Sequence, residues 1–184
     1  MPRKEQSGAE QHRQAHEESD REEGDREEGD RELRRRLKQT QPFESRAQEA
    51  MLSLMVAGAA VEQEVEQACA RFGLTASHYN VLRILDGGPE AGYARGEIIE
   101  RMIDRGPDVT RLMDRLEEQG LASRQCSEED RRVTLHRITD EGTALLEEMH
   151  EDIRVVQHRF AERLSEKDQQ TLTTLCAKVY DVES

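Results

Sequence analysis

Thr110 and Arg111 are the side chains in this sequence whose type and position best suit contact with nucleic-acid bases. An arginine guanidinium can make two parallel hydrogen bonds to a guanine edge, and a threonine can bond to a base or touch a thymine methyl. Both residues lie near the start of a predicted helix, on the polar face that also holds Asp114. The alternative interpretation is an exposed helix with ordinary surface charge.

A second group of candidate residues lies at a predicted hairpin tip, where Asp130 precedes Arg131 and Arg132. Adjacent residues on a strand point to opposite faces, so the two arginines diverge. Asp130 is close enough in sequence to orient one guanidinium through a charge-assisted hydrogen bond. An arginine in this position suits a narrow minor groove, where the potential is most negative. A surface salt bridge of little energetic value is the simpler interpretation.

Apolar spacing predicts the helix and the strands that carry these residues. Val109, Leu112, Met113 and Leu116 form one helical stripe, and Pro107 suits the first turn of that helix. Asp108 adds negative charge where the helix dipole favours it, and Gly120 ends the helix. The period then changes to about two residues, which predicts strands at 121–126 and 133–138.

Five further helices are expected from the same kind of pattern. A long helix follows Pro42 and ends near Gly73, and a short one follows the N-cap residue Thr75. A third covers about Gly96 to Ile103, with Ile98, Ile99, Met102 and Ile103 pointing inward. After Thr139 comes a long helix whose residues Leu146, Met149, Ile153, Val156 and Phe160 have coiled-coil spacing, and Ser165 with Asp168 caps a last helix.

Helix, short turn, helix and a basic hairpin together are the arrangement of a winged helix-turn-helix. The predicted fold is therefore mainly α with a small β-hairpin wing, joined to a long-helix dimerisation region. The chain has 27 Lys and Arg against 40 Asp and Glu, a net charge of −13, so DNA binding would need a local basic patch. Residues 1–41 hold 22 charged and five apolar side chains, which predicts a disordered charged tail with a basic cluster at 34–38.

Several classes of protein lack support in the sequence. It has no apolar run long enough for a membrane span and no secretory signal, and its three cysteines fit a reducing compartment, so we expect a cytoplasmic protein. It has no Gly-rich phosphate loop, nucleophile elbow or Cys-Xaa-Xaa-Cys pair, and its six histidines are scattered. We therefore expect no enzyme, no cofactor and no metal site.

Four linked motifs give a family resemblance: residues 107–117, 120–124, Asp130-Arg131-Arg132 and 138–142. In this order they resemble the MarR family, named for multiple antibiotic resistance. The resemblance covers about residues 74–146. It implies a dimerisation helix at 42–73, a winged helix-turn-helix at 74–139 and dimerisation helices at 140–184, while the charged tail at 1–41 is longer than the family pattern needs. The segment 92–97 departs from the family pattern, which leaves the start of the third helix uncertain.

The resemblance also implies a function and a set of contact residues. We expect a homodimer that binds a pseudo-palindromic operator in double-stranded DNA, a repressor in most members of the family. Arg132 would enter the minor groove and Arg131 would contact phosphate, as would the hydroxyls of Thr75 and Ser77, while Arg124 would hold a phosphate or the wing. The complete set of expected DNA-binding residues is Thr75, Ser77, Pro107, Thr110, Arg111, Asp114, Arg115, Arg124, Asp130, Arg131 and Arg132.

Release from DNA by a small lipophilic or aromatic effector is the expected regulation. Met51, Met55, Phe72 and Tyr79 would line its pocket, although the same residues could be simple core. Two alternatives stay open. One is a thiol-based redox regulator, chiefly through Cys126, with Cys69 and Cys176 as buried and inert cysteines. The other is a helical scaffold protein that binds no DNA, which would leave the wing arginines unexplained.

Overall fold

The computed structural model describes residues 29–128 and 130–180, and its contacts divide the chain into two compact units, Met1–Ala59 and Ala60–Ser184. Helix α2 (Arg46–Ala70) passes through this division, and it begins four residues later than the sequence predicted. The division therefore lies within the predicted dimerisation helix. Each unit is described below by itself.

Part of the predicted disordered tail is helical in the first unit. The tail was expected at 1–41, and its first part lies outside the described residues, but residues 29–37 form a helix. Leu33 is only 7% exposed, and Arg34 pairs with Asp30 one turn earlier, at 2.7 Å. Helix-favouring side chains and ion pairs at this spacing stabilise a helix. The predicted tail therefore includes a helical segment in which Leu33 is buried.

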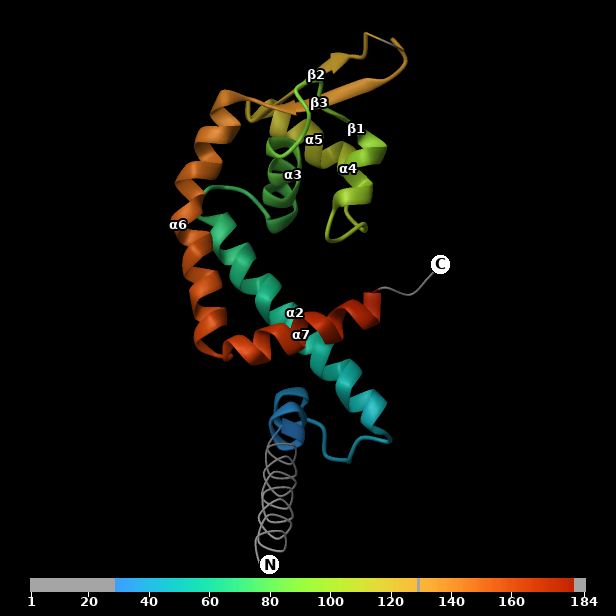
Figure 1. Cartoon of the computed structure of the whole chain (residues 1–184), viewed down its shortest axis with the longest axis vertical. Coiled ribbons are helices and arrows are strands. Elements are labelled where there is room, and N and C mark those ends of the chain that lie inside the picture. Colours follow the sequence, from blue (N-terminus) through green and yellow to red (C-terminus); the bar gives the residue numbers. More distant parts are fainter. Residues whose placement is uncertain (1–28, 129, 181–184) are drawn as a thin grey trace, which may run out of the picture. The chain divides into compact units, whose positions relative to one another are not determined.

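The second unit contains the predicted winged helix (Figure 1). Its helices are α3 (Ala76–Asp86), α4 (Arg95–Arg101), α5 (Val109–Glu118), α6 (Asp140–Glu162) and α7 (Glu166–Tyr180). Its antiparallel sheet has the order β1-β3-β2, from strands β1 (Tyr93–Ala94), β2 (Ala122–Cys126) and β3 (Thr134–Ile138). The mainly α fold with a hairpin wing is confirmed, and the two predicted strands are correct to within one residue.

Strand β1 was not predicted, and it explains the unusual segment before the third helix. Tyr93 is paired with His136 of β3, and Gly92 turns the chain into the strand with a φ of +88°. A Cβ at Gly92 would lie 2.5 Å from the carbonyl oxygen of His136, so only glycine fits. A strand of two residues has no alternation long enough to recognise in the sequence.

Helix α4 begins and ends earlier than predicted. The amide of Ala94 donates to Glu97 Oε2 at 2.9 Å, which places the first helical residue at Arg95. Ile98 and Met102 are buried as expected, but Ile103 is 91% exposed. The prediction that Ile103 points inward was wrong because the backbone is already extended at Met102, where the helix has ended.

A compact core joins α3, α4, α5 and α6 of this unit. Its fully buried side chains are Cys69, Val81, Leu82, Ile98, Met113, Leu116 and Met149. The predicted stripe of α6 is confirmed, since Leu146, Met149, Ile153 and Val156 are all buried in this core. These four residues are therefore covered within the chain, while Phe160 at the end of the predicted stripe is half-buried.

The end of α5 is tied directly to the start of α6. Gly120 (φ +72°) and Leu121 close α5 by donating to Glu117 O and Leu116 O, both at 2.9 Å. The hydroxyl of Thr139 donates to Gly120 O at 2.6 Å and accepts from the amide of Gly142 at 3.1 Å. Thr139 thus caps α6 and fastens it to the end of α5. No helix in the described residues is long and apolar enough to span a membrane.

Candidate nucleic-acid interface

Helix α5 is held at its start by an aspartate. Asp108 is the N-cap, and its Oδ1 accepts from the amides of Thr110 at 3.1 Å and Arg111 at 3.4 Å. This satisfies two amides that have no partner within the helix. Pro107 lies one residue before the cap, so its predicted place in the first helical turn was wrong. The reason is that the side chain of Asp108 does the capping, which moves the helix start to Val109.

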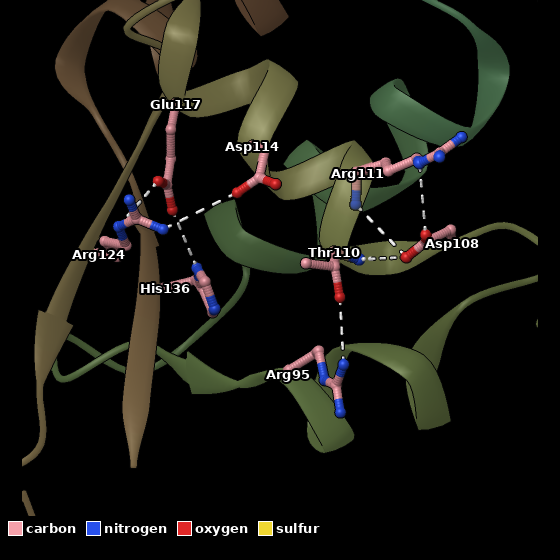
Figure 2. Close-up of polar contacts among 8 residues, drawn as sticks. All are labelled: Arg95, Asp108, Thr110, Arg111, Asp114, Glu117, Arg124 and His136. Atoms are coloured by element: carbon pink, nitrogen blue, oxygen red, sulfur yellow. Dashed lines mark hydrogen bonds and ion pairs between the residues drawn. The ribbon is translucent and has the colours of Figure 1, made fainter. Parts of the chain in front are cut away.

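One face of α5 is fixed in the core and the other is exposed. Val109, Met113 and Leu116 are buried, with at most 4% exposed. On the opposite face the side chain of Arg111 is 89% exposed, and its Nε lies 3.7 Å from Asp108 Oδ2 (Figure 2). Thr110 accepts from Arg95 Nη1 of α4 at 3.1 Å. The exposed face is therefore a polar surface on a firmly packed helix.

Asp114 and Arg115 complete that face, and each is engaged with a neighbour. Arg115 lies 3.4 Å from Glu118 on the same helix, and Asp114 lies 3.8 Å from Arg124 of β2. Surface pairs of this kind contribute about 0–1 kcal/mol and are easily exchanged for another partner. Asp114 lies one turn after Thr110 and Arg115 one turn after Arg111, and both are exposed.

The hairpin tip is closed by main-chain bonds. Ser127 N donates to Val133 O and Val133 N donates to Asp130 O, both at 2.9 Å. Asp130 Oδ1 accepts from the backbone amide of Arg132 at 2.9 Å. The prediction that Asp130 orients a guanidinium was wrong, because within the described residues its carboxylate binds this amide instead. Arg131 and Arg132 are both exposed.

Arg124 joins the wing to α5, which matches one of its two predicted roles. Its Nε lies 3.2 Å from Glu117 Oε2, and His136 Nδ1 lies 3.3 Å from the other oxygen of the same carboxylate (Figure 2). The motif reading did not select Glu117, His136 or Arg95. Strand alternation offered one signal, because His136 shares a face with the core residue Ile138.

Thr75 and Ser77, the expected phosphate contacts, lie at the start of α3. Thr75 Oγ1 accepts from the amide of His78 at 3.2 Å and lies 2.7 Å from the imidazole Nδ1. Burial, followed by the nearby Arg115, lowers the pKa of His78. The amide of Ala76 donates to Glu66 Oε2 at 2.5 Å. The hydroxyl of Thr75 is therefore already used as a helix cap, while Ser77 is half-buried.

A hollow of about 340 Å³ lies between α4, α5 and β3, and Arg95, Thr110 and His136 contribute to its lining. The residues predicted for an effector pocket fall in two groups. Met51 and Met55 belong to the first unit and are more than half exposed. Phe72 and Tyr79 belong to the second unit, where they pack against the core. The effector pocket stays a prediction.

The three cysteines differ in burial. Cys69 is fully buried, and burial, with a smaller effect of Glu66, raises its thiol pKa to about 11, so it is a poor nucleophile at neutral pH. Cys126 is exposed at the end of β2, and Cys176 is half-buried. Within the described residues no group of three His, Cys, Asp or Glu side chains is placed to hold a metal ion.

Comparison with known proteins identifies the family. A MarR family sequence model matches residues 72–133. A MarR transcription factor from Planctomyces limnophilus is 34% identical, over 73% of this chain and 97% of that chain, with a TM-score of 0.57. The chain belongs to the MarR family. It is therefore a winged-helix transcriptional regulator of that family.

Two further MarR-like structures contain DNA. The repressor CouR bound to a 23-mer DNA duplex is 28% identical, over 70% of this chain and 89% of that chain, with a TM-score of 0.62. MepR of S. aureus in complex with DNA is 21% identical, over 73% and 97%, with a TM-score of 0.64, and shows the likeness of fold alone. None of the curated proteins compared with the chain matches it.

Proposed function

We propose that this MarR-family chain binds duplex DNA as a homodimer, with α5 in the major groove and the β2–β3 wing over the adjacent minor groove. The exposed face of α5 carries the proposal: Arg111 is 89% exposed on a helix whose opposite face is buried and whose start is capped. An arginine on such a helix can make bidentate contacts to guanine, and the helix backbone is already fixed before DNA binds. Residues 74–139 form the DNA-binding part in this proposal.

The DNA complexes of CouR and MepR support the proposal by fold likeness. Thr110 and Arg111 would read bases, helped by Pro107, Asp114 and Arg115 at the same surface. Arg132 would enter the minor groove, with Asp130 holding the turn through the Arg132 amide. Thr75, Ser77 and Arg131 would contact phosphates, and Arg124 would hold the wing through its contact with Glu117.

Two alanine variants distinguish the roles proposed for Arg111 and Arg132. Arg111→Ala should weaken operator binding by about 1–3 kcal/mol and relax the preference at one base pair, because a base contact is lost. Arg132→Ala should weaken binding most where the flank is A/T-rich, since narrow minor grooves attract arginine. Gel-shift titrations against the operator and random duplexes measure both effects.

Arg154→Ala is the matched control for these variants, because Arg154 is an exposed arginine on α6 whose one ion-pair partner within residues 29–128 and 130–180 is its helix neighbour Glu151. It removes the same charge and should change operator and random binding little. Equal losses on operator and random DNA for Arg111→Ala would remove this residue from the base-reading role.

Exposed apolar residues on α7 support the proposed dimer. Leu175, Val179 and Tyr180 are each more than half exposed, although an apolar stripe normally packs against another surface. A two-fold dimer would present its recognition helices to half-sites about 10 base pairs apart, which matches a pseudo-palindromic operator. Residues 42–73 and 140–184 are the dimerisation parts in this proposal. A monomer in sedimentation at micromolar concentration, with one half-site protected, would contradict it.

We also propose that the protein represses transcription and that a small lipophilic or aromatic anion releases it. An effector that binds the DNA-incompetent state more tightly loosens DNA only by its differential affinity, so about 1–3 kcal/mol of coupling corresponds to a 5- to 150-fold loss. Salicylate is the probe, in a thermal-shift assay and an operator-release assay. Benzyl alcohol, a neutral compound of similar size, controls for the charge.

The exposure of Cys126 supports one alternative regulation, by thiol oxidation. Its thiol lies on a strand of the wing, whereas that of Cys69 is buried. Release by peroxide but not by salicylate, abolished in Cys126→Ser, would assign the switch to this thiol. Stabilisation by salicylate without release would leave a binding site that is not a switch.

A further inference from the structure

The carboxylate of Glu117 binds both strands of the wing from the recognition helix. Its side chain is 15% exposed, and each of its oxygens has a different partner. Oε2 lies 3.2 Å from Nε of Arg124 on β2, and Oε1 lies 3.3 Å from Nδ1 of His136 on β3 (Figure 2). A single side chain of α5 therefore contacts two neighbouring strands.

The sheet register places Arg124 and His136, the two partners of Glu117, side by side in the wing. Arg124 and His136 are directly opposite each other in the β2–β3 pairing, and Tyr93 of β1 is opposite His136 on the other side. Side chains directly opposite in an antiparallel pair lie on the same face of the sheet. Both partners of Glu117 thus face α5, and their separation is set by the backbone ladder.

The polar contacts of Glu117 with Arg124 and His136 restrain the wing more closely than apolar packing does. His136 is only 8% exposed, and a carboxylate with little solvent contact is stable only while it is paired. Apolar contacts of the core tolerate small sliding movements, whereas a hydrogen bond with His136 and an ion pair with Arg124, at separate carboxylate oxygens, limit the movement of both strands relative to α5. Asp114 adds a weaker contact to Arg124 at 3.8 Å.

The two elements that would read DNA meet at this carboxylate. Helix α5 carries Thr110 and Arg111, and strands β2 and β3 lead to Arg131 and Arg132. We propose that Glu117 is a positioning residue that sets the wing against the recognition helix, so that base contacts and minor-groove contacts form together. The inference rests on the proposed DNA-binding function.

The first test compares Glu117→Gln with Glu118→Gln. Both variants remove one negative charge from α5, but Glu118 is exposed and, among the described residues, pairs with its helix neighbour Arg115 alone. Glu117→Gln should lose at least about fivefold in operator affinity while random-DNA affinity changes little. Hydroxyl-radical protection of the flanking minor groove should weaken, because the wing is no longer held. Glu118→Gln should change operator and random affinity equally and keep the protection.

A second variant, His136→Leu, keeps the inference testable if Glu117→Gln folds poorly. Leucine fills the buried site and leaves the carboxylate with Arg124 alone, so operator affinity and wing protection should fall as in Glu117→Gln. The double variant should lose no more than Glu117→Gln alone, because both changes act through one contact. Melting curves by circular dichroism establish that each variant is folded at the assay temperature.

Two results would overturn the inference. One is a Glu117→Gln protein that behaves like Glu118→Gln on operator, random DNA and footprint. The other is an equal loss on operator and random DNA, which points to a general defect. Failure of the unaltered protein to prefer any operator would instead overturn the proposed function, and it would be seen before any variant is compared.

Discussion

Helices α6 and α7 follow each other in the chain and carry similar apolar stripes, yet their surroundings differ. In α6, Leu146, Met149, Ile153 and Val156 are all buried. In α7 none of the 15 residues is buried, and Leu175 is 52% exposed. The two stripes advance by the same steps of three and four residues, so spacing alone does not distinguish them.

The difference teaches that a stripe predicts a contact but not the partner in it. Residues of α6 pack against α3 and the end of α2, within one chain. Nothing among the described residues of the second unit covers the stripe of α7 to the same degree. The proposed dimer therefore depends on α7, and the coiled-coil spacing of α6 carries no argument for it.

Met149→Ala should produce the largest effect and would establish the structural role of α6. Met149 is 1% exposed, and a cavity at such a site costs about 2–5 kcal/mol of unfolding free energy. Urea denaturation measures the loss. Val155→Ala, on the exposed side of the same helix, should cost less than about 0.5 kcal/mol, and similar losses for both variants would contradict the assignment of buried and exposed faces.

Leu175→Glu should separate the roles of the two helices. A charge in the centre of a dimer interface costs about 2 kcal/mol or more, so the dimer dissociation constant should rise about 30-fold. The winged-helix unit should remain folded, because Leu175 is outside its buried core. Sedimentation equilibrium measures the change, with Thr173→Glu on another face of α7 as the control. An unchanged dimer would refute the role proposed for this stripe.

Acid should loosen the side-chain cap of α7 but not the side-chain cap of α6, and this is the smallest effect. Hydrogen bonds from the hydroxyl and amide of Ser165 lower the pKa of Asp168. Its contribution is therefore present above the unfolded value of about 3.9 and is lost as pH falls through the still lower folded pKa. Thr139, which caps α6, does not titrate.

The amide resonance of Ser165 in an NMR titration from neutral pH to below pH 4 reports the loss of this cap. Asp168→Asn should remove the dependence, since an amide side chain does not titrate there. A similar acid shift at the amide of Gly142, which donates to Thr139 in α6, would contradict the comparison.

Much of the fold could be predicted because its signals are local. The predicted caps at Thr75 and Ser165 act within four residues of themselves, and both are observed. Strand β1 and the exposure of Ile103 could not be predicted in the same way. A strand of two residues exists only because β3 lies beside it, and the end of α4 depends on where the chain must turn.

In the candidate site, too, features with a local sequence signal could be predicted and contacts between distant residues could not. The exposed face of α5 could be recognised from helical periodicity, and Arg124 was expected to hold either a phosphate or the wing. The contact of Glu117 with His136 joins residues 19 positions apart, and the spacing of neither residue signals the other. Asp130 was expected to bind a guanidinium of its neighbours, but it accepts from the backbone amide of Arg132, which a short side chain reaches more easily.

The joint at Thr139 has a mechanical consequence. Its hydroxyl ties the last turn of α5 to the first turn of α6, and Gly142 packs so closely on Leu121 that no Cβ would fit. Because the contact between the end of α5 and the start of α6 is tightly packed, a rotation of α6 also rotates α5. Helix α6 has 23 residues and is about 35 Å long, so a sideways shift of about 3 Å at its far end turns the joint by about 5°. A small displacement at the far end of α6 would therefore change the orientation of α5, the helix proposed to read DNA.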